Sequence, residues 1–182
     1  MRITTILGSP RKKGNTATTL ACFEEHAGNQ HAIERINVTG YTIKGCLGCW
    51  VCQRTPREPG CIQRDDGNMI LEKLINSDLI VYASPVYVWG FTAQLKTLLD
   101  RQCSLVKYME GGGEQLLEGK WAALLTTCAG SGESNADLIR QIFQREMDYL
   151  GCTVTGMYVL DKCGEPSELG ERAMYIADKM ME

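Results

Sequence analysis

The stretch "RITTILGSPRKKGNTATTLACFEEHAG", residues 2–28, shows the order of elements that determines the fold. Residues 2–8 are a short apolar run rich in β-branched residues that stops at Gly-Ser-Pro, as a buried strand does. Residues 15–28 then read as a helix, with Asn15 or Thr16 as its expected cap and Gly28 at its end. A strand, a short loop and a helix in this order predict an α/β fold.

The same alternation of strand and helix continues to the end of the chain. Parallel strands need crossover helices, so five strands and five helices predict a three-layer, doubly wound sheet in one domain, residues 1–182. Residues 39–65 form a long irregular loop, and residues 103–119 stay unassigned because "GGG" at 111–113 indicates a flexible excursion. The further strands are expected at 31–38, 78–84, 120–128 and 152–160, and the further helices at 65–77, 92–102, 133–151 and 166–181.

The composition limits the classes of partner. A chain of 182 residues with 44% apolar and 23% charged residues fits a soluble globular domain. The net charge of −3 predicts neither a nucleic-acid nor a membrane partner. No apolar run is long enough to span a membrane or to form a signal peptide, so we expect a cytoplasmic protein.

Three loops follow the carboxyl ends of strands, where doubly wound sheets bind ligands. The first, "GSPRKKGNTATT" (8–19), combines small glycines, hydroxyl and amide donors, three cationic side chains and a helix N-terminus. These are the parts of a cradle for one phosphate monoester, and the alternative is a solvated basic loop. The motif matches neither a P-loop nor a dinucleotide fingerprint.

The other two loops could accommodate a flat ring. In "SPVYVWGFTAQLK" (84–96), Tyr87 and Trp89 are expected in an exposed loop, where aromatic side chains can stack on a ligand. In "TTCAGSGE" (126–133), Gly130 and Gly132 let the backbone approach a planar group closely. The alternatives are satellite packing of the two aromatic residues and an ordinary turn before a helix. Together the three loops have the anatomy of a flavin mononucleotide site.

"GSPRKKGNT", "SPVYVWGFTAQLKTLLDR" and "TTCAGSG" together resemble the flavodoxin-like NAD(P)H-dependent FMN reductases, and the branch that includes the iron–sulfur flavoproteins is most similar. The resemblance covers roughly residues 2–160 and implies strand order 2-1-3-4-5. It implies an FMN phosphate on the first loop, the isoalloxazine along the second, and its other edge on the third. The FMN-binding residues that the resemblance implies are, in the first loop, Ser9, Arg11, Lys12, Gly14, Asn15 and Thr16; in the second, Pro85, Val86, Tyr87, Val88 and Trp89; and in the third, Thr127, Cys128 and Gly130.

The resemblance also implies the chemistry. NAD(P)H would reduce the flavin, which would pass electrons to a small-molecule acceptor or a redox protein, so no catalytic acid or base is expected. The alternative is an iron–sulfur flavoprotein or a flavodoxin-type carrier that does not oxidise nicotinamide directly. The resemblance further implies a homodimer or homotetramer.

The loop after the second strand holds "GCLGCWVCQRTPREPGC", residues 45–61, with the spacing C-x2-C-x2-C-x8-C. Disulfides are disfavoured in the expected compartment, and zinc usually takes two separated cysteine pairs. The compact step resembles the ligand run of [4Fe–4S] proteins, and iron–sulfur flavoproteins carry such a motif in this loop. A cluster, zinc and no metal stay open as alternatives. The candidate ligands are Cys46, Cys49, Cys52 and Cys61.

The remaining side chains of interest receive a structural interpretation. Asp65 and Asp66 are expected to start a helix rather than to bind a metal. Cys128 lies in a loop that should touch the flavin, although simple packing is the alternative. Cysteines expected only to pack are Cys22, Cys103, Cys152 and Cys163.

Overall fold

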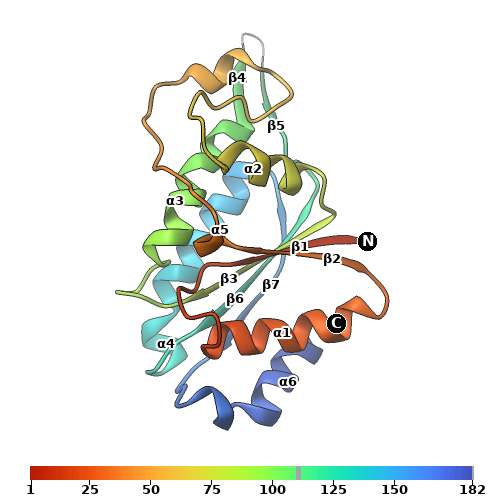
Figure 1. The fold of residues 1–182 in the computed structure, drawn as a ribbon, viewed down its shortest axis with the longest axis vertical. Helices are drawn as coiled ribbons and strands as arrows, with labels where there is room; N and C mark the ends of the chain where they lie inside the picture. The colour runs from red at the N-terminus through yellow and green to blue at the C-terminus, as the bar shows by residue number, and fades with distance from the viewer. Residues whose placement is uncertain (110–111, 182) are drawn as a thin grey trace.

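A five-stranded parallel sheet forms the centre of the molecule (Figure 1). The computed structural model describes residues 1–109 and 112–181. The strand order is β2-β1-β3-β6-β7, which confirms the predicted flavodoxin-like order 2-1-3-4-5. The strands are β1 (Arg2–Leu7), β2 (Ala32–Asn37), β3 (Leu79–Pro85), β6 (Trp121–Thr127) and β7 (Thr153–Leu160).

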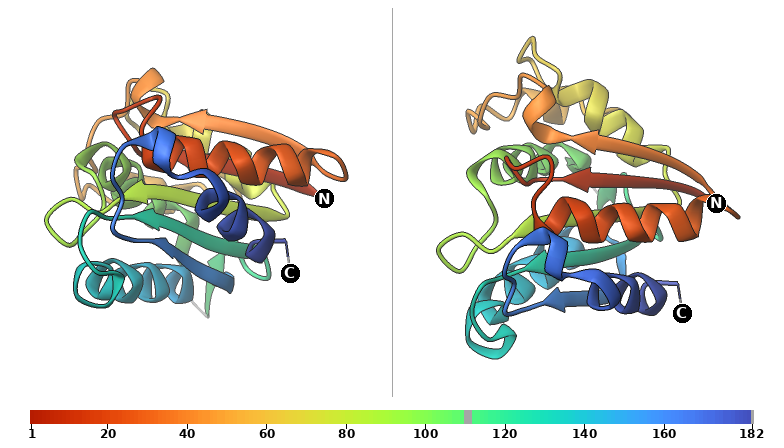
Figure 2. Two further views of the ribbon diagram at one scale, coloured as in Figure 1. Left: turned by 90° about the horizontal axis from the view of Figure 1, so that it is seen from below. Right: turned by 60° about the horizontal axis from the view of Figure 1, so that its bottom comes forward.

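Helices cover both faces of the sheet. Figure 2 shows the first helix, α1, lying beside the last, α6, under one face, and the other long helices cover the opposite face (Figure 1). The result is the predicted three-layer arrangement. The helices are α1 (Asn15–Gly28), α2 (Gly67–Ile75), α3 (Ala93–Arg101), α4 (Gly132–Asn135), α5 (Asp137–Leu150) and α6 (Gly170–Lys179).

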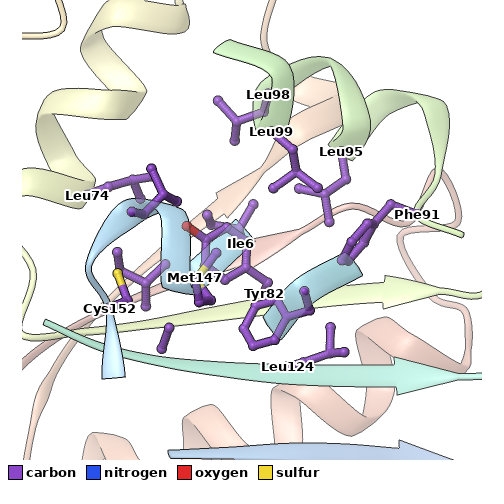
Figure 3. Close-up of a cluster of buried hydrophobic side chains, with 14 of the residues drawn as sticks. Ile6, Leu74, Tyr82, Phe91, Leu95, Leu98, Leu99, Leu124, Met147 and Cys152 are labelled. Carbon is purple, nitrogen blue, oxygen red and sulfur yellow. The ribbon is translucent and has the colours of Figure 1, made fainter. Parts of the chain in front are cut away.

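Alternating side chains of the central strands supply two hydrophobic cores. In β3, Tyr82 joins the core shared with α2, α3 and α5, while Val81 joins the core shared with α1 and α6. Figure 3 shows apolar side chains of α3, including Leu95 and Leu99, above this part of the sheet. Burial of β3 on both faces explains its continuous apolar sequence.

The segment left unassigned by the sequence adopts regular structure. It contains the 3₁₀ turn η3 (Gln102–Leu105) and an antiparallel pair, β4 (Val106–Met109) and β5 (Gly112–Gln115). This pair lies apart from the main sheet and beside the cysteine-rich loop (Figure 1). Gly111, part of the expected glycine-rich excursion, lies outside the described residues.

Two predicted helices are shorter than expected. The helix predicted at 133–151 is broken at Ala136 (φ −110°, ψ 4°) into α4 and α5. The helix predicted at 166–181 begins with a 3₁₀ turn, η4 (Pro166–Glu168). Within the described part of the chain, no helix is long and apolar enough to cross a membrane.

Candidate functional site

Hydrogen bonds join the three predicted loops at the carboxyl edge of the sheet. The Gly8 N–H at the end of β1 donates to the Ala83 carbonyl of β3 (2.8 Å). The Val86 N–H after β3 donates to the Thr127 carbonyl of β6 (2.9 Å). The hydroxyls of Thr16 and Thr127 lie 2.7 Å apart and link the first loop to the third. The protein's own hydrogen bonds therefore hold the three loops together.

The first loop is a tight turn that ends in an open helix N-terminus. The buried Ser9 hydroxyl accepts from the Arg11 N–H (3.2 Å), and the Gly14 N–H donates to the Arg11 carbonyl (3.1 Å). Gly14 is the N-cap of α1 and no side chain caps the helix, so the expectation that Asn15 or Thr16 does so is wrong. The uncapped N–H groups and helix dipole favour an anion.

Asn15, in the first turn of α1, is positioned by a contact with the loop after β7. Asn15 Nδ2 donates to the Gly164 carbonyl after β7 (3.0 Å), whereas its buried Oδ1 has no hydrogen-bond partner. A ligand hydroxyl could satisfy this oxygen, because a buried acceptor without a donor is costly. Arg11 and Lys12 are exposed and free to meet a phosphate from the solvent side.

The second loop presents aromatic side chains on an unusual backbone. Tyr87 and Gly90 form two backbone hydrogen bonds (3.0 and 3.1 Å), and between them Val88 and Trp89 have φ angles of +49° and +60°. Left-handed backbone at such residues costs of order 1–3 kcal/mol each and is concentrated at functional sites. The side chains of Tyr87 and Trp89 are 46% and 52% exposed, as the sequence predicted. Nothing in the sequence "VYVWG" indicates the positive φ angles.

The third loop is compact. The Cys128 thiol contacts the Gly130 carbonyl (3.4 Å), and the Cys128 N–H donates to the Leu160 carbonyl of β7 (3.1 Å). Burial, with a contribution from nearby Asp161, raises the pKa of the Cys128 thiol, which keeps it protonated. A Cβ on Gly130 would lie 2.5 Å from Asn135 Nδ2, so glycine permits the close turn.

The cysteine-rich loop encloses a second candidate site. A cavity of about 100 Å³ is lined by the four predicted ligands and by Cys103 of η3, which the sequence assigned to packing alone. Cys46 Sγ lies 3.7 Å from Cys103 Sγ. Burial and the adjacent Cys46 raise the pKa of Cys103 to about 12.

The thiols of the cysteine cavity are not gathered around one point in the described part of the chain. Among the described residues, no three His, Cys, Asp or Glu side chains are placed to hold one ion. A tetrahedral zinc site needs its sulfur ligands around a single point. Thiolates on a [4Fe–4S] cube each bind a different iron and so stand farther apart.

Two buried cations flank the cysteine cavity. Arg101, 1% exposed, lines the cavity and binds buried Asp65 (2.8 Å). Lys107, fully buried on β4, donates to the carbonyls of Cys52 (3.0 Å) and Pro59 (3.3 Å), and no carboxylate in the described residues pairs with it. Burial lowers the pKa of Lys107, while the nearby Cys52 sulfur favours its charged form. Arg101 thus borders the cavity directly, whereas Lys107 reaches its wall through the Cys52 carbonyl.

Helix α3 connects the two candidate sites. At its start, the Thr92 hydroxyl caps the helix by accepting from the Leu95 N–H (3.2 Å) and donates to the Gly8 carbonyl (2.6 Å). At its end, Arg101 donates to the Lys44 carbonyl (2.9 Å) in the cysteine-rich loop. Asp65 and Asp66 fix the same loop by accepting from backbone N–H groups. Asp65 also accepts from the Gly67 N–H at the start of α2, as its predicted helix-starting role requires, whereas the N-cap residue Asp66 makes no side-chain cap.

Comparison with known proteins identifies the class of this chain. Residues 1–161 match the family model described as NADPH-dependent FMN reductase, and the chain belongs to that family. An iron–sulfur flavoprotein from Archaeoglobus fulgidus is 34% identical over 134 residues, which cover 73% of this chain and 57% of that protein. FMN-dependent NADH:quinone oxidoreductase 2 from Pseudomonas fluorescens is 33% identical over 112 residues, covering 58% and 55%.

The fold has close counterparts among solved structures. The NAD(P)H:quinone oxidoreductase from Methanothermobacter marburgensis superposes with a TM-score of 0.76 at 16% identity, covering 100% of this chain and 96% of that one. At this identity the likeness establishes the fold alone. The sequence matches span little more than half the length of the relatives named above.

Proposed function

We propose that the chain binds FMN at the carboxyl edge of its sheet and oxidises NAD(P)H, passing electrons to a small-molecule acceptor. The observation that carries the proposal is the open N-terminus of α1 within three hydrogen-bonded loops. Family membership and the quinone-reducing relative support the same activity. FMN, when bound, supplies the hydride and electron chemistry, while the protein binds and orients it.

Each loop has a distinct part in this proposal. Ser9, Gly14 and the first N–H groups of α1 would surround the phosphate, with Arg11 and Lys12 adding charge. Pro85 to Trp89 would lie along the flavin ring, and Thr127 to Gly130 would border its other edge. Cys128 stays a neutral thiol in this arrangement and does no acid–base work. No general acid or base is assigned.

The phosphate assignment is tested by titrating the full chain with FMN and measuring the quenching of flavin fluorescence. Removing a charge-assisted hydrogen bond costs about 1.5–3 kcal/mol, so Arg11→Ala should raise the Kd about tenfold or more. The matched control is Arg145→Ala on the exposed surface of α5. Unchanged affinity in Arg11→Ala and Asn15→Ala together would overturn the assignment, and absence of FMN binding by the wild type would overturn the proposal.

The reductase and the electron carrier differ in one measurement. Anaerobic mixing of the FMN-loaded protein with NADH or NADPH should bleach the flavin absorbance within a catalytic turnover time. If neither nicotinamide bleaches the flavin while dithionite does, the protein is a carrier. Light scattering tests the homodimer or homotetramer that we expect.

A second proposal concerns the cysteine cavity: we infer that Cys46, Cys49, Cys52 and Cys61 hold a [4Fe–4S] cluster. The enclosing cavity, the buried positive charge of Lys107 and the likeness to an iron–sulfur flavoprotein support it. Protein purified without air should contain about four irons and four sulfides per chain. Cys49→Ser should lose them and Cys152→Ser, a buried cysteine elsewhere, should not.

A further inference from the structure

The cysteine cavity contains one more thiol than the four-cysteine motif supplies. Cys46 is exposed in the loop after β2, and Cys103 is half-buried in η3 at the end of α3. Their sulfurs are 3.7 Å apart although the residues are separated by 57 positions. The Gly48 N–H donates to Cys46 Sγ (3.4 Å) and orients this sulfur.

We propose that Cys46 and Cys103 form a reversible disulfide when the protein meets a small-molecule disulfide oxidant. Bond formation requires the two sulfurs to approach from 3.7 Å to the length of a disulfide bond, about 2.05 Å. Cys46 can make this movement because it lies outside helices and strands, whereas Cys103 is fixed by the turn that follows α3. The inference concerns the chain without a cluster on Cys46, needs no FMN, and goes beyond the proposed function.

The chemistry is two successive thiol–disulfide exchanges. The Cys46 thiolate attacks one sulfur of oxidised glutathione, forms a mixed disulfide and releases one glutathione thiolate. Cys103 transfers its proton to the released glutathione thiolate and attacks the Cys46 sulfur, and the second glutathione thiolate leaves. Two protein thiols are thus oxidised to one disulfide, and one glutathione disulfide is reduced to two thiols.

The surrounding structure restrains two of the other cavity cysteines. Cys61 is held by two hydrogen bonds between its backbone and Asn68 (2.8 and 3.2 Å), and the Cys52 carbonyl is engaged by Lys107. Sequence proximity alone would instead favour Cys46 with Cys49. The disulfide would join the loop after β2 to the end of α3 and would remove Cys46 from the set of candidate cluster ligands.

Peptide mapping tests the proposal on the full chain. The FMN-treated protein, freed of iron with a chelator, is incubated with oxidised glutathione, alkylated, and digested with trypsin. The expected product links residues 45–54 to residues 102–107, with fragmentation placing the bond at Cys46, and dithiothreitol abolishes it. Cys103→Ser should lose this product, and Cys152→Ser should keep it.

Other outcomes have distinct meanings. A bond from Cys46 to Cys49, Cys52 or Cys61, or stable glutathione adducts without a protein disulfide, would overturn the proposal. Flavin absorbance is read on the same samples. FMN binding without the linked peptide overturns this inference alone, whereas the linked peptide without FMN binding overturns the proposed function alone.

Discussion

Removing the Asp65 carboxylate should destabilise the protein far more than removing a surface carboxylate. Asp65 accepts two hydrogen bonds from Arg101 (2.8 and 3.2 Å) and one each from the N–H groups of Lys44 and Gly67 (both 2.9 Å). Both charged side chains are buried, so Asp65→Ala leaves the Arg101 guanidinium without a counter-charge. Breaking such a buried pair costs about 3–5 kcal/mol. This is a large part of the free energy of unfolding of a typical protein, about 5–15 kcal/mol.

Urea unfolding followed by circular dichroism measures this loss. The matched control is Asp100→Ala, which breaks the exposed Lys96–Asp100 pair and should cost about 0.5 kcal/mol or less. Replacing both partners, Asp65→Leu with Arg101→Met, should recover most of the loss because no buried charge is left. A loss below about 1 kcal/mol for Asp65→Ala, or one equal to that of the control, would refute the reasoning.

The same pair predicts how stability depends on pH. Burial opposes ionisation of Asp65, but hydrogen bonds from Arg101 and the backbone outweigh it and lower the pKa of Asp65 below its usual value. A lowered carboxyl pKa gives stability that is complete above the unfolded-state value, about 3.9, and is lost as the pH falls below it. The wild type should therefore lose stability below about pH 4 more steeply than Asp65→Leu with Arg101→Met.

Three further outcomes are expected. Gly8→Ala should lower stability by about 1–3 kcal/mol in urea, because the new Cβ would lie 2.6 Å from Leu95 Cβ; Gly40→Ala, with open space around it, is the control. Val88→Gly should be neutral or stabilising by up to about 1 kcal/mol in the same assay, since glycine adopts positive φ without strain. A clear loss of stability would show that the positive φ of Val88 is not strained. Glu146→Gln should raise the urea midpoint at pH 8 but not at pH 4.5. Burial raises the pKa of Glu146 to about 7, so ionisation of this carboxyl destabilises the native state increasingly as the pH rises from 4.5 to 7. Equal effects of the substitution at both pH values would show that ionisation of Glu146 is not the cause.

Local sequence patterns were sufficient to predict the sheet and most helices. Each central strand is apolar throughout because helices cover both faces, and each turn is marked by glycine, proline or a polar residue. The approximate ends of β1, β3 and α1 could therefore be predicted from the residues themselves. The three loops were correctly expected at one edge because parallel strands share a direction.

Features that depend on contacts between distant segments could not be predicted. Cys103 follows α3 and carries no motif, so its approach to Cys46 follows only from the path of the intervening chain. Burial of Lys107 depends on how the pair β4–β5 packs on the cysteine-rich loop. The Asp65–Arg101 pair joins residues 36 positions apart, and the sequence indicated only the helix-starting preference of aspartate.

The way α3 is anchored sets which parts of the chain can change in length. Its nine residues span about 14 Å, and buried Leu95, Leu98 and Leu99 fix it on the sheet (Figure 3). The separation between Thr92 and Arg101 is thus determined by a rigid rod rather than by a loop. Residues can be inserted between Cys52 and Cys61 without altering that separation, whereas one residue inserted in α3 would rotate Arg101 away from Asp65.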